Sequence, residues 1–326
     1  MQHTDASSMT SLRHEELRLD DEWIIAQRGP RNRVDPSLPY AVTVEPELGA
    51  AGDVADVATV FITNRECPFR CLMCDLWKNT TTQRVPDGVI PRQIEYALPR
   101  VPSARRIKLY NSGNFFDGRA IPRADWVGIA QLLAGFQTVI VESHPRLIDA
   151  RCKELADLLD PDLEVAMGLE TVDPSALARL NKRMTLGDYE SATKFLSDMG
   201  VRVRAFILLR TPFQSEAQGV QWARRSIDFA FSVGVECCSV IPTRVGNGAM
   251  EWLQANGHFS PPRLSSLEET LDYGVGLGAG RVFADLWDIE RFFSCPDCGP
   301  ARVERMRRIN LSQEVLPRVT CNCGFA

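Results

Sequence analysis

Short apolar runs alternate with longer amphipathic stretches between about residues 55 and 280 of the chain. The runs are rich in β-branched residues and short enough for strands, and the stretches between them repeat their apolar residues at helical spacing. The predicted strands are residues 57–63, 106–111, 138–142, 163–169, 201–209 and 236–242. The predicted helices are residues 91–98, 123–134, 145–159, 186–199, 216–233 and 262–275. This alternation predicts an α/β fold.

Continuous apolar strands separated by helices are typical of parallel βαβ units, in which helices cover both faces of the sheet. In such units the carboxyl ends of the strands meet at one edge, where functional residues gather. We expect three parts: an N-terminal extension over residues 1–50, the βα array over 51–280, and a cysteine-rich metal-binding tail over 281–326. The side chains that carry chemistry should therefore follow the predicted strands.

Three cysteines follow the first predicted strand, in the sequence Cys67-Pro-Phe-Arg-Cys71-Leu-Met-Cys74. Thiolates are the ligands of iron–sulfur clusters, and three of them would hold three irons of a [4Fe–4S] cubane and leave the fourth iron open. The alternatives are buried structural cysteines and a zinc site completed by a histidine. Three thiols within eight residues argue against core packing, and no histidine lies between His14 and His144. The spacing favours the cluster.

Four more cysteines lie near the C-terminus, as Cys295-Pro-Asp-Cys298 and, after 22 intervening residues, Cys321-Asn-Cys323. Paired cysteine knuckles are typical of zinc ribbons, although the second pair is tighter than usual. Four thiolates also suit an auxiliary iron–sulfur cluster. We predict a metal site here and favour zinc.

The composition indicates a globular protein of the cytoplasm. The 326 residues are 44% hydrophobic, which is enough for one large core. No run reaches the roughly 18 apolar residues of a membrane span, and the first residues lack the pattern of a signal peptide. Ten grouped cysteines without an export signal suggest metal in a reducing compartment. The net charge of −5 is mild evidence against a polyanionic substrate, although a local basic patch would suffice.

A basic segment precedes the predicted array and contains Arg28, Arg31 and Arg33 among turn-forming residues. One interpretation is an arm that Trp23 and Ile24 pack against the exterior of the array. The other is a clamp for an anionic group of a substrate, since arginine forks match phosphate and carboxylate. We favour the packed arm.

Polar residues at or within the predicted strands suggest a ligand site. Glu142 ends the third strand, where it could do acid–base work or simply belong to a turn. Glu170 ends the fourth strand, where an unpaired carboxylate would be costly, so a ligand hydroxyl is a plausible partner. Arg204 lies within an apolar strand and needs an anion. Thr243 leads into a glycine-rich loop after the sixth strand.

The order of motifs resembles a known superfamily. The motifs are the three-cysteine loop, Ser-Gly-x-Phe-x-Asp at 112–117, Val-Glu-Ser-x-Pro at 141–145, Gly-Leu-Glu-Thr at 168–171, Asn-Lys at 181–182 and Pro-Phe-x-x-Glu at 212–216. The cysteine loop resembles the signature of the radical S-adenosylmethionine (SAM) superfamily. The whole series resembles its branch with the archaeosine-synthase radical SAM subunit and the Elongator-catalytic-subunit-like relatives. This resemblance implies an incomplete (β/α)6 TIM-type barrel, here with an N-terminal arm and a small cysteine-rich tail.

The resemblance also implies cofactors and their ligands. In that superfamily SAM binds the open iron of a [4Fe–4S] cluster, and an electron from the cluster breaks SAM to release a 5′-deoxyadenosyl radical. Metal-binding and catalytic roles are then expected for Cys67, Cys71 and Cys74. A reduced ferredoxin or flavodoxin is expected as the electron donor.

Several strand-end residues would then contact SAM. The turn Ser112-Gly113-Asn114 stands where the superfamily presents backbone carbonyls to the SAM amino group, usually from Gly-Gly-Glu. Glu170 would meet the ribose hydroxyls, and Arg204 the SAM carboxylate. We also count Glu142 and Thr243, the latter beside the adenine, among the expected cofactor-binding residues.

We therefore predict a radical SAM enzyme that abstracts hydrogen from a substrate in tRNA nucleoside modification. Archaeal members of the similar branch cleave the lysine from a lysine-adducted 7-deazaguanine in tRNA. One alternative is a radical SAM enzyme of small-molecule or peptide biosynthesis, which the acidic composition favours. Another is a non-catalytic metal-binding sensor or interaction protein. The expected partners are the electron donor and a tRNA or small-molecule substrate, and no membrane.

Overall fold

The computed structural model describes residues 17–323 of the chain. Its strands form one eight-stranded sheet in which neighbours follow the order of the sequence. The strands are β1 (Ala41–Leu48), β2 (Val54–Phe61), β3 (Arg106–Tyr110), β4 (Thr138–Ser143), β5 (Asp162–Glu170), β6 (Arg202–Leu209), β7 (Cys237–Pro242) and β8 (Arg281–Ala284). β1 is antiparallel to β2, and β2 to β8 are parallel, so the carboxyl ends of these seven strands form one edge, which we call the carboxyl edge.

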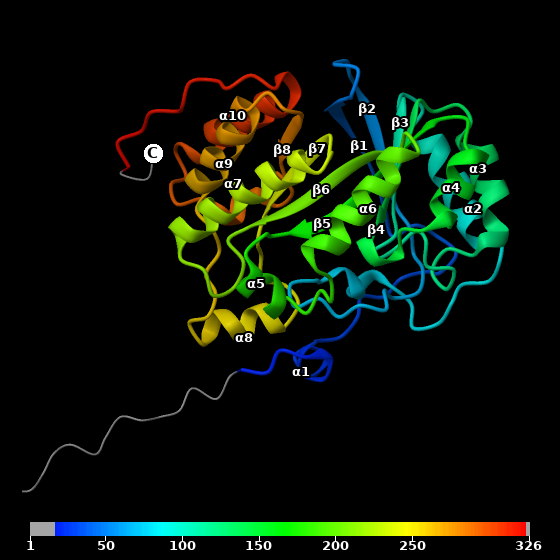
Figure 1. Cartoon of the computed structure of the whole chain (residues 1–326), viewed down its shortest axis with the longest axis horizontal. Coiled ribbons are helices and arrows are strands. Elements are labelled where there is room, and N and C mark those ends of the chain that lie inside the picture. The colour runs from blue at the N-terminus through cyan, green and yellow to red at the C-terminus, as the bar shows by residue number, and fades with distance from the viewer. Residues whose placement is uncertain (1–16, 324–326) are drawn as a thin grey trace, which may run out of the picture.

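Apart from α1, which precedes β1, and α10, which follows β8, the helices lie between strands in sequence, and they lie outside the sheet in space (Figure 1). They are α1 (Asp21–Ala26), α2 (Val89–Ala97), α3 (Trp126–Leu133), α4 (Ala150–Leu158), α5 (Pro174–Arg179), α6 (Leu186–Asp198), α7 (Glu216–Ser232), α8 (Ala249–Ala255), α9 (Leu264–Gly276) and α10 (Gly299–Ser312). In Figure 1, α2, α3 and α4 gather on one side of the molecule, and α7, α9 and α10 on the other. The helices α1, α5 and α8 lie at the lower end of that view.

The predicted α/β fold, an incomplete TIM-type barrel, is confirmed. All six predicted strands are present, because their apolar runs are buried between the helices; β4, for example, is buried along its whole length. The strands β1 and β8 were not predicted, nor were α1, α5, α8 and α10. The division into three parts stays a prediction, and the sheet takes one strand from each of the flanking parts.

Local sequence explains where the longer helices begin. Thr185 and Asp188 form a reciprocal capping box at the start of α6, and Ser215 and Gln218 do the same for α7. Cys152, Cys237 and Cys238 are buried. None of the helices between residues 17 and 323 combines the length and apolar character that crossing a membrane requires.

Helix α10 packs against both edge strands, β1 and β8, and so fills the open side of the incomplete barrel. Arg281 of β8 adds a bridge, because its Nη1 donates to the carbonyl oxygen of Leu48 at the end of β1 (2.9 Å). The open side of the barrel is therefore closed by the chain itself.

A buried network of ion pairs lies inside the barrel, toward the amino ends of the strands. Arg204 is 2% exposed, and it donates to Glu164 (2.6 Å) and to Glu47 (2.7 Å). Glu47 also pairs with Lys108, and Glu164 with Arg281 (3.2 Å). Burial opposes the charge on Glu47, but Arg204 and Lys108 hold the pKa of this carboxyl below its usual range.

The expected role of Arg204 as the partner of the SAM carboxylate therefore needs correction. The arginine does need an anion, but Glu47 and Glu164 of this chain supply two. It also pairs in register with the first residue of β7, toward the amino ends of the strands and not at the carboxyl edge.

Candidate active site at the carboxyl edge

The three-cysteine loop follows β2 and lies at the carboxyl edge of the sheet. Cys67, Cys71 and Cys74 are half-buried, and Leu72 between them is fully buried. Leu72 packs in a small apolar cluster with Ile24 of α1, Leu180, Leu253 of α8 and others. The apolar residue within the loop thus anchors it, while the thiols stay at the surface of that cluster.

The N-terminal arm packs directly against this loop. Arg28 and Arg31 both pair with Glu66, the residue before the first cysteine, and Arg28 does so at 2.7 Å. Both guanidinium groups also lie over the ring of Trp77. These two arginines support the loop through a carboxylate of the chain, as a packed arm would.

Asn114, which follows β3, contacts the first cysteine of the loop. Its Nδ2 donates to Sγ of Cys67 (3.0 Å), and its Oδ1 accepts the backbone N–H of His144 (2.6 Å). The backbone N–H of Phe69 also donates to the Cys67 sulfur (3.4 Å). The ring of Phe69 stacks on the imidazole of His144, with 3.8 Å between ring centroids.

Two further asparagines hold the rest of the loop through their side-chain amides. Asn181, which follows α5, donates from Nδ2 to the carbonyl oxygen of Arg70 (2.8 Å). Asn247, which follows β7, donates from Nδ2 to the carbonyl oxygens of Leu72 (2.7 Å) and Cys74 (3.2 Å). Together with Asn114, these amides fix the loop from three different connections of the barrel.

Glu142 at the end of β4 holds the turn that follows β3. Its Oε1 accepts the backbone N–H groups of Asn111 (2.7 Å) and Gly113 (3.2 Å). Burial raises the pKa of Glu142 to about 7, although the N–H groups of the turn oppose that rise. Ser112 takes a left-handed conformation with φ of +53°, a strained state that is common near functional sites. A Cβ on Gly113 would lie 3.3 Å from Cβ of Cys67, so the turn packs closely on the loop.

Glu170 at the end of β5 forms a buried ion pair with Lys182. Oε1 of Glu170 lies 2.7 Å from Nζ of Lys182, and Lys182 is 5% exposed. A Cβ on Gly168 would collide with both charged groups, so the glycine provides the room for the pair. Burial opposes the charge on Lys182, but Glu170 and Cys71 raise the pKa of the lysine above its usual range.

The metal-free thiols of the loop are poor acids. Burial raises the pKa of Cys67 to about 11 and the pKa values of Cys71 and Cys74 to about 12. The positive charge of Lys182 opposes this rise at Cys67 and Cys71. Thiolate ligation to iron therefore has to supply the free energy that removes the protons.

The donor set of this edge fits a cluster with three thiolates and a polar ligand beside it. The fixed loop offers three sulfurs, and the sulfur of Cys67 receives one N–H from within the loop and one from Asn114 outside it. Within the described part of the chain, the amide of Asn111 and the hydroxyls of Thr63 and Thr211 are buried without a partner. All three lie just after parallel strands, and such groups indicate that a ligand or water completes them.

The other residues expected to bind SAM are accounted for as follows. Ser112, Gly113, Asn114, Glu142 and Glu170 all lie at the carboxyl edge, near the cysteine loop or the turn that packs on it. Thr243 directly follows β7, and its hydroxyl donates to the carbonyl oxygen of Leu209 (2.8 Å). Apart from Arg204, their contacts with SAM stay predictions.

Sequence reasoning did not assign roles to Asn181, Lys182 and Asn247. Asn181 and Lys182 form the Asn-Lys motif, and Asn247 lies in the glycine-rich loop after the sixth predicted strand. Their spacing in the sequence does not show that they contact the cysteine loop. His144 also had no role assigned from the sequence. Burial lowers its pKa to about 3, so the ring is neutral, and its Nε2 donates to the carbonyl oxygen of Lys182 (2.9 Å).

The four tail cysteines come together at the start of α10. Cys295 and Cys298 are buried, and the sulfurs of Cys298 and Cys323 lie 3.8 Å apart. All four sulfurs lie within 4.8 Å of one another. Four thiolates placed about 2.3 Å from one zinc ion in a tetrahedron would be separated by about 3.8 Å. The tail cysteines can therefore hold a metal ion.

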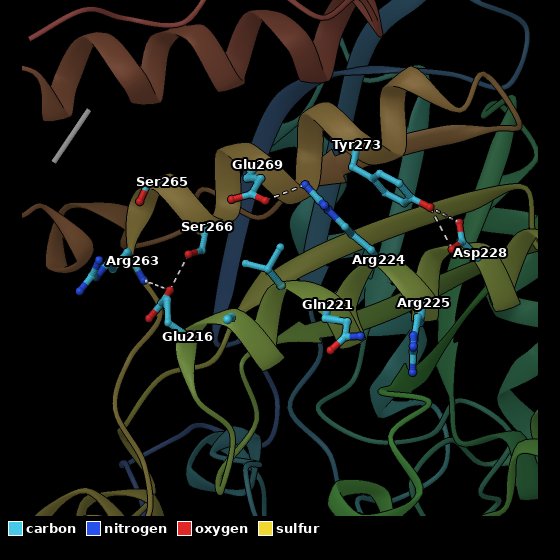
Figure 2. A pocket seen from close by; sticks show the side chains of 12 residues that line it. Glu216, Gln221, Arg224, Arg225, Asp228, Arg263, Ser265, Ser266, Glu269 and Tyr273 are labelled. Carbon is cyan, nitrogen blue, oxygen red and sulfur yellow. Dashed lines mark hydrogen bonds and ion pairs between the residues drawn. The ribbon is translucent and has the colours of Figure 1, made fainter.

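A groove of about 610 Å³ lies elsewhere, on the outside of the barrel between α7 and α9 (Figure 2). Several of the charged groups that line it pair with one another. Arg224 pairs with Glu269 (2.7 Å), and Tyr273 donates to Asp228 (2.8 Å), as Figure 2 shows. The groove is separate from the cysteine loop, and we assign it no part in the chemistry.

Comparison with known proteins gives three relatives by sequence, whereas no protein-family profile matches the chain. An uncharacterised protein of Methanocaldococcus jannaschii is 22% identical over 89% of this chain and 86% of its own length. The archaeosine synthase subunit beta of Thermococcus kodakarensis is 28% identical over 62% of this chain and 65% of that subunit. The same subunit of Methanosarcina acetivorans is 29% identical over 67% of this chain and 66% of that subunit. The chain thus matches about two thirds of the length of each of these two subunits.

Among solved structures, methylornithine synthase has a similar fold. The similarity covers 77% of this chain and 68% of that enzyme, with a TM-score of 0.52 and 13% identity. The fold and the two named relatives agree with the resemblance to the radical SAM superfamily that the cysteine loop carries.

Proposed function

We propose that Cys67, Cys71 and Cys74 hold a [4Fe–4S] cluster whose open iron binds SAM. The observation that carries this proposal is a loop with three thiols, fixed by three asparagine amides at the carboxyl edge of a radical SAM fold. When bound, the cluster and SAM supply a radical that abstracts a hydrogen atom from a substrate. The chain supplies orientation, three sulfur ligands and exclusion of water.

The residues around the loop have defined tasks in this proposal. Glu142 shapes the turn 111–113, which would lie against the SAM amino group. Lys182 takes the place of Arg204 as the proposed partner of the SAM carboxylate, because it is the buried cation that acts on Cys67 and Cys71. Glu170 holds Lys182 in place and would lie near the ribose hydroxyls.

The proposed substrate is a modified nucleoside in tRNA, and the proposed reaction is the lysine-releasing step of the archaeosine-synthase type. Two relatives named archaeosine synthase subunit beta support this substrate class. Their names also support a second subunit as a partner of this chain. A reduced ferredoxin or flavodoxin would deliver the electron. A cytoplasmic location suits a protein whose ten cysteines are all free of disulfides.

We further propose zinc for the tail cysteines, since the separation of their sulfurs matches a single tetrahedral ion. An iron–sulfur core with several irons would need its cysteine sulfurs farther apart than a single ion does. Zinc here would be structural, because all four positions around it would be filled by protein.

The test begins with anaerobically reconstituted protein, dithionite and SAM. We expect 5′-deoxyadenosine from the wild type and none from Cys71→Ala, because a loop with two thiolates cannot hold the three irons. A wild type that contains a [4Fe–4S] cluster but forms no 5′-deoxyadenosine would contradict the proposed chemistry and favour a metal-binding sensor.

The substrate is tested by adding tRNA with or without the lysine-adducted 7-deazaguanine. We expect lysine release and extra 5′-deoxyadenosine only with the adducted tRNA. Binding should weaken steeply with salt, because phosphate contacts release counterions. Turnover that ignores tRNA and rises with a small metabolite or peptide would favour the biosynthetic alternative.

A further inference from the structure

One side chain outside the cysteine loop donates directly to a sulfur that is proposed to bind iron. Nδ2 of Asn114 lies 3.0 Å from Sγ of Cys67, and Asn114 is 2% exposed. A hydrogen bond to a ligand sulfur is one of the features that set the reduction potential of an iron–sulfur cluster. Asn114 therefore has a candidate role that differs from direct contact with SAM.

The orientation of the Asn114 amide is fixed by its other end. Oδ1 accepts the backbone N–H of His144 at 2.6 Å, and only an oxygen can accept that bond. A flipped amide would place its NH₂ against this N–H and its oxygen against the sulfur, and both contacts would be repulsive. The NH₂ group must therefore face Cys67.

His144 is itself held in one place. Its ring stacks on Phe69 of the cysteine loop, its Nε2 donates to the carbonyl oxygen of Lys182, and its Nδ1 accepts the N–H of Arg146 (3.2 Å). The backbone N–H of His144 fixes the Asn114 amide, and the ring of the same residue contacts the cysteine loop through Phe69. The Asn114 amide and the Cys67 sulfur are therefore held in a fixed position relative to each other.

We propose that Asn114 is a positioning residue that raises the reduction potential of the cluster through Cys67. This inference rests on the proposed function, because it needs a cluster on the loop. One-electron reduction adds one negative charge, part of which lies on the thiolate sulfurs. An N–H that points at one of those sulfurs stabilises the reduced state more than the oxidised state, since hydrogen bonds to charged groups are the stronger ones. Asn114 would thereby ease electron transfer from the donor protein.

The sharpest variant is Asn114→Asp, which has nearly the same shape. One carboxylate oxygen can still accept the N–H of His144, while the other replaces the NH₂ that faces the sulfur. The donor is lost and a negative charge is added, so the cluster should be harder to reduce. Asn114→Ala removes the donor without adding a charge and should shift the potential in the same direction by less.

The measurement is a redox titration of the reconstituted full chain without substrate, followed by electron paramagnetic resonance. For Asn114→Ala we expect roughly a tenfold fall in the ratio of reduced to oxidised cluster at a fixed potential, which is about 59 mV for one electron. Asn114→Asp should exceed that shift.

Asn181→Gly is the matched control. Asn181 donates to a carbonyl oxygen of the loop and not to a sulfur, and its φ of +49° suits glycine. This variant should hold less cluster but keep the wild-type potential.

The outcomes separate this inference from the proposed function. An unchanged potential in both Asn114 variants overturns the inference and leaves the cluster in place. Failure of both variants to hold a cluster that Asn181→Gly retains also overturns it, because Asn114 would then only hold the loop. A wild type without a [4Fe–4S] cluster would instead overturn the proposed function.

Discussion

The chain carries two groups of cysteines that are built in different ways. The three loop cysteines come from eight consecutive residues, and asparagine side chains from three other connections hold that stretch. The four tail cysteines come from two separate segments, and their sulfurs lie within 4.8 Å of one another. In the loop a sulfur faces an amide donor, whereas in the tail sulfurs face each other. The first arrangement suits a cofactor with an open position, and the second suits the enclosure of one ion.

The charges near the two groups differ as well. Beside the loop, one lysine and one glutamate form an isolated buried pair, Lys182 and Glu170. Beside the tail, Glu268 lies 2.5 Å from Arg302 and 3.6 Å from Arg305, and Arg305 also pairs with Asp272 (2.7 Å). In the single pair, removal of one residue leaves the other charge without a partner. In the network, a second residue of opposite charge still lies near the one that remains. This difference predicts unequal responses to mutation.

The largest effect should separate the two metal sites. Cys298→Ala removes one of four ligands from the tail, so we expect the purified protein to lose its zinc and to unfold more readily. The iron content and the formation of 5′-deoxyadenosine should persist, because the loop does not depend on these sulfurs. Metal analysis together with the SAM-cleavage assay checks this. Loss of iron in place of zinc would show that the tail holds a cluster.

The next effect tests the isolated pair against the network. Lys182→Met leaves Glu170 buried without a partner, and we expect the free energy of unfolding to fall by about 3–5 kcal/mol. Arg302→Met should cost less, about 1–3 kcal/mol, because Arg305 still lies near Glu268. Urea unfolding of both variants provides the comparison. If both variants lose the same free energy of unfolding, the neighbouring Arg305 does not compensate for the loss of Arg302.

An effect smaller than that of Lys182→Met concerns pH at the turn beside the loop. The pKa of Glu142 is raised from 4.5 to about 7. Between these values the folded chain keeps a proton that the unfolded chain has released, so stability falls as pH rises. Glu142→Gln cannot ionise and keeps an acceptor for the turn. Relative to this variant, the wild type should lose about 3 kcal/mol between pH 4.5 and pH 7.

Urea unfolding of both proteins across that range is the measurement. The difference between them should grow through the window and level off above about pH 7. If the unfolding free energies of the two proteins change with pH in the same way, the pKa of Glu142 is not raised. Burial would then have no effect on its protonation.

The six central strands could be predicted because each is a buried apolar run, and burial on both faces leaves a plain trace in the sequence. β1 could not, because it is an edge strand without a fully buried residue and contains Thr43, Glu45, Pro46 and Glu47. β8 is only four residues long and begins with Arg281. α10 is rich in arginine, so its buried face is hard to recognise from hydrophobicity.

The unpredicted strand explains the correction at Arg204. An arginine in an apolar strand does need an anion, but one of its two carboxylates, Glu47, belongs to β1. The other carboxylate, Glu164, lies in a predicted strand, but its contact with Arg204 depends on how β5 and β6 pair, which the sequence pattern does not give. At the site, spacing could identify the thiols, which belong to one short loop. It could not identify Asn247 or Lys182, because their contacts with the loop exist only after the barrel forms.

The helix between the two edge strands has a practical consequence for anyone who shortens this protein. A chain cut after Gly280 would lose β8, the Arg281 bridge to Leu48 and the helix that separates the inside of the barrel from water. The residues from β8 to the end of α10 therefore belong to the barrel itself, and a shortened protein should keep them.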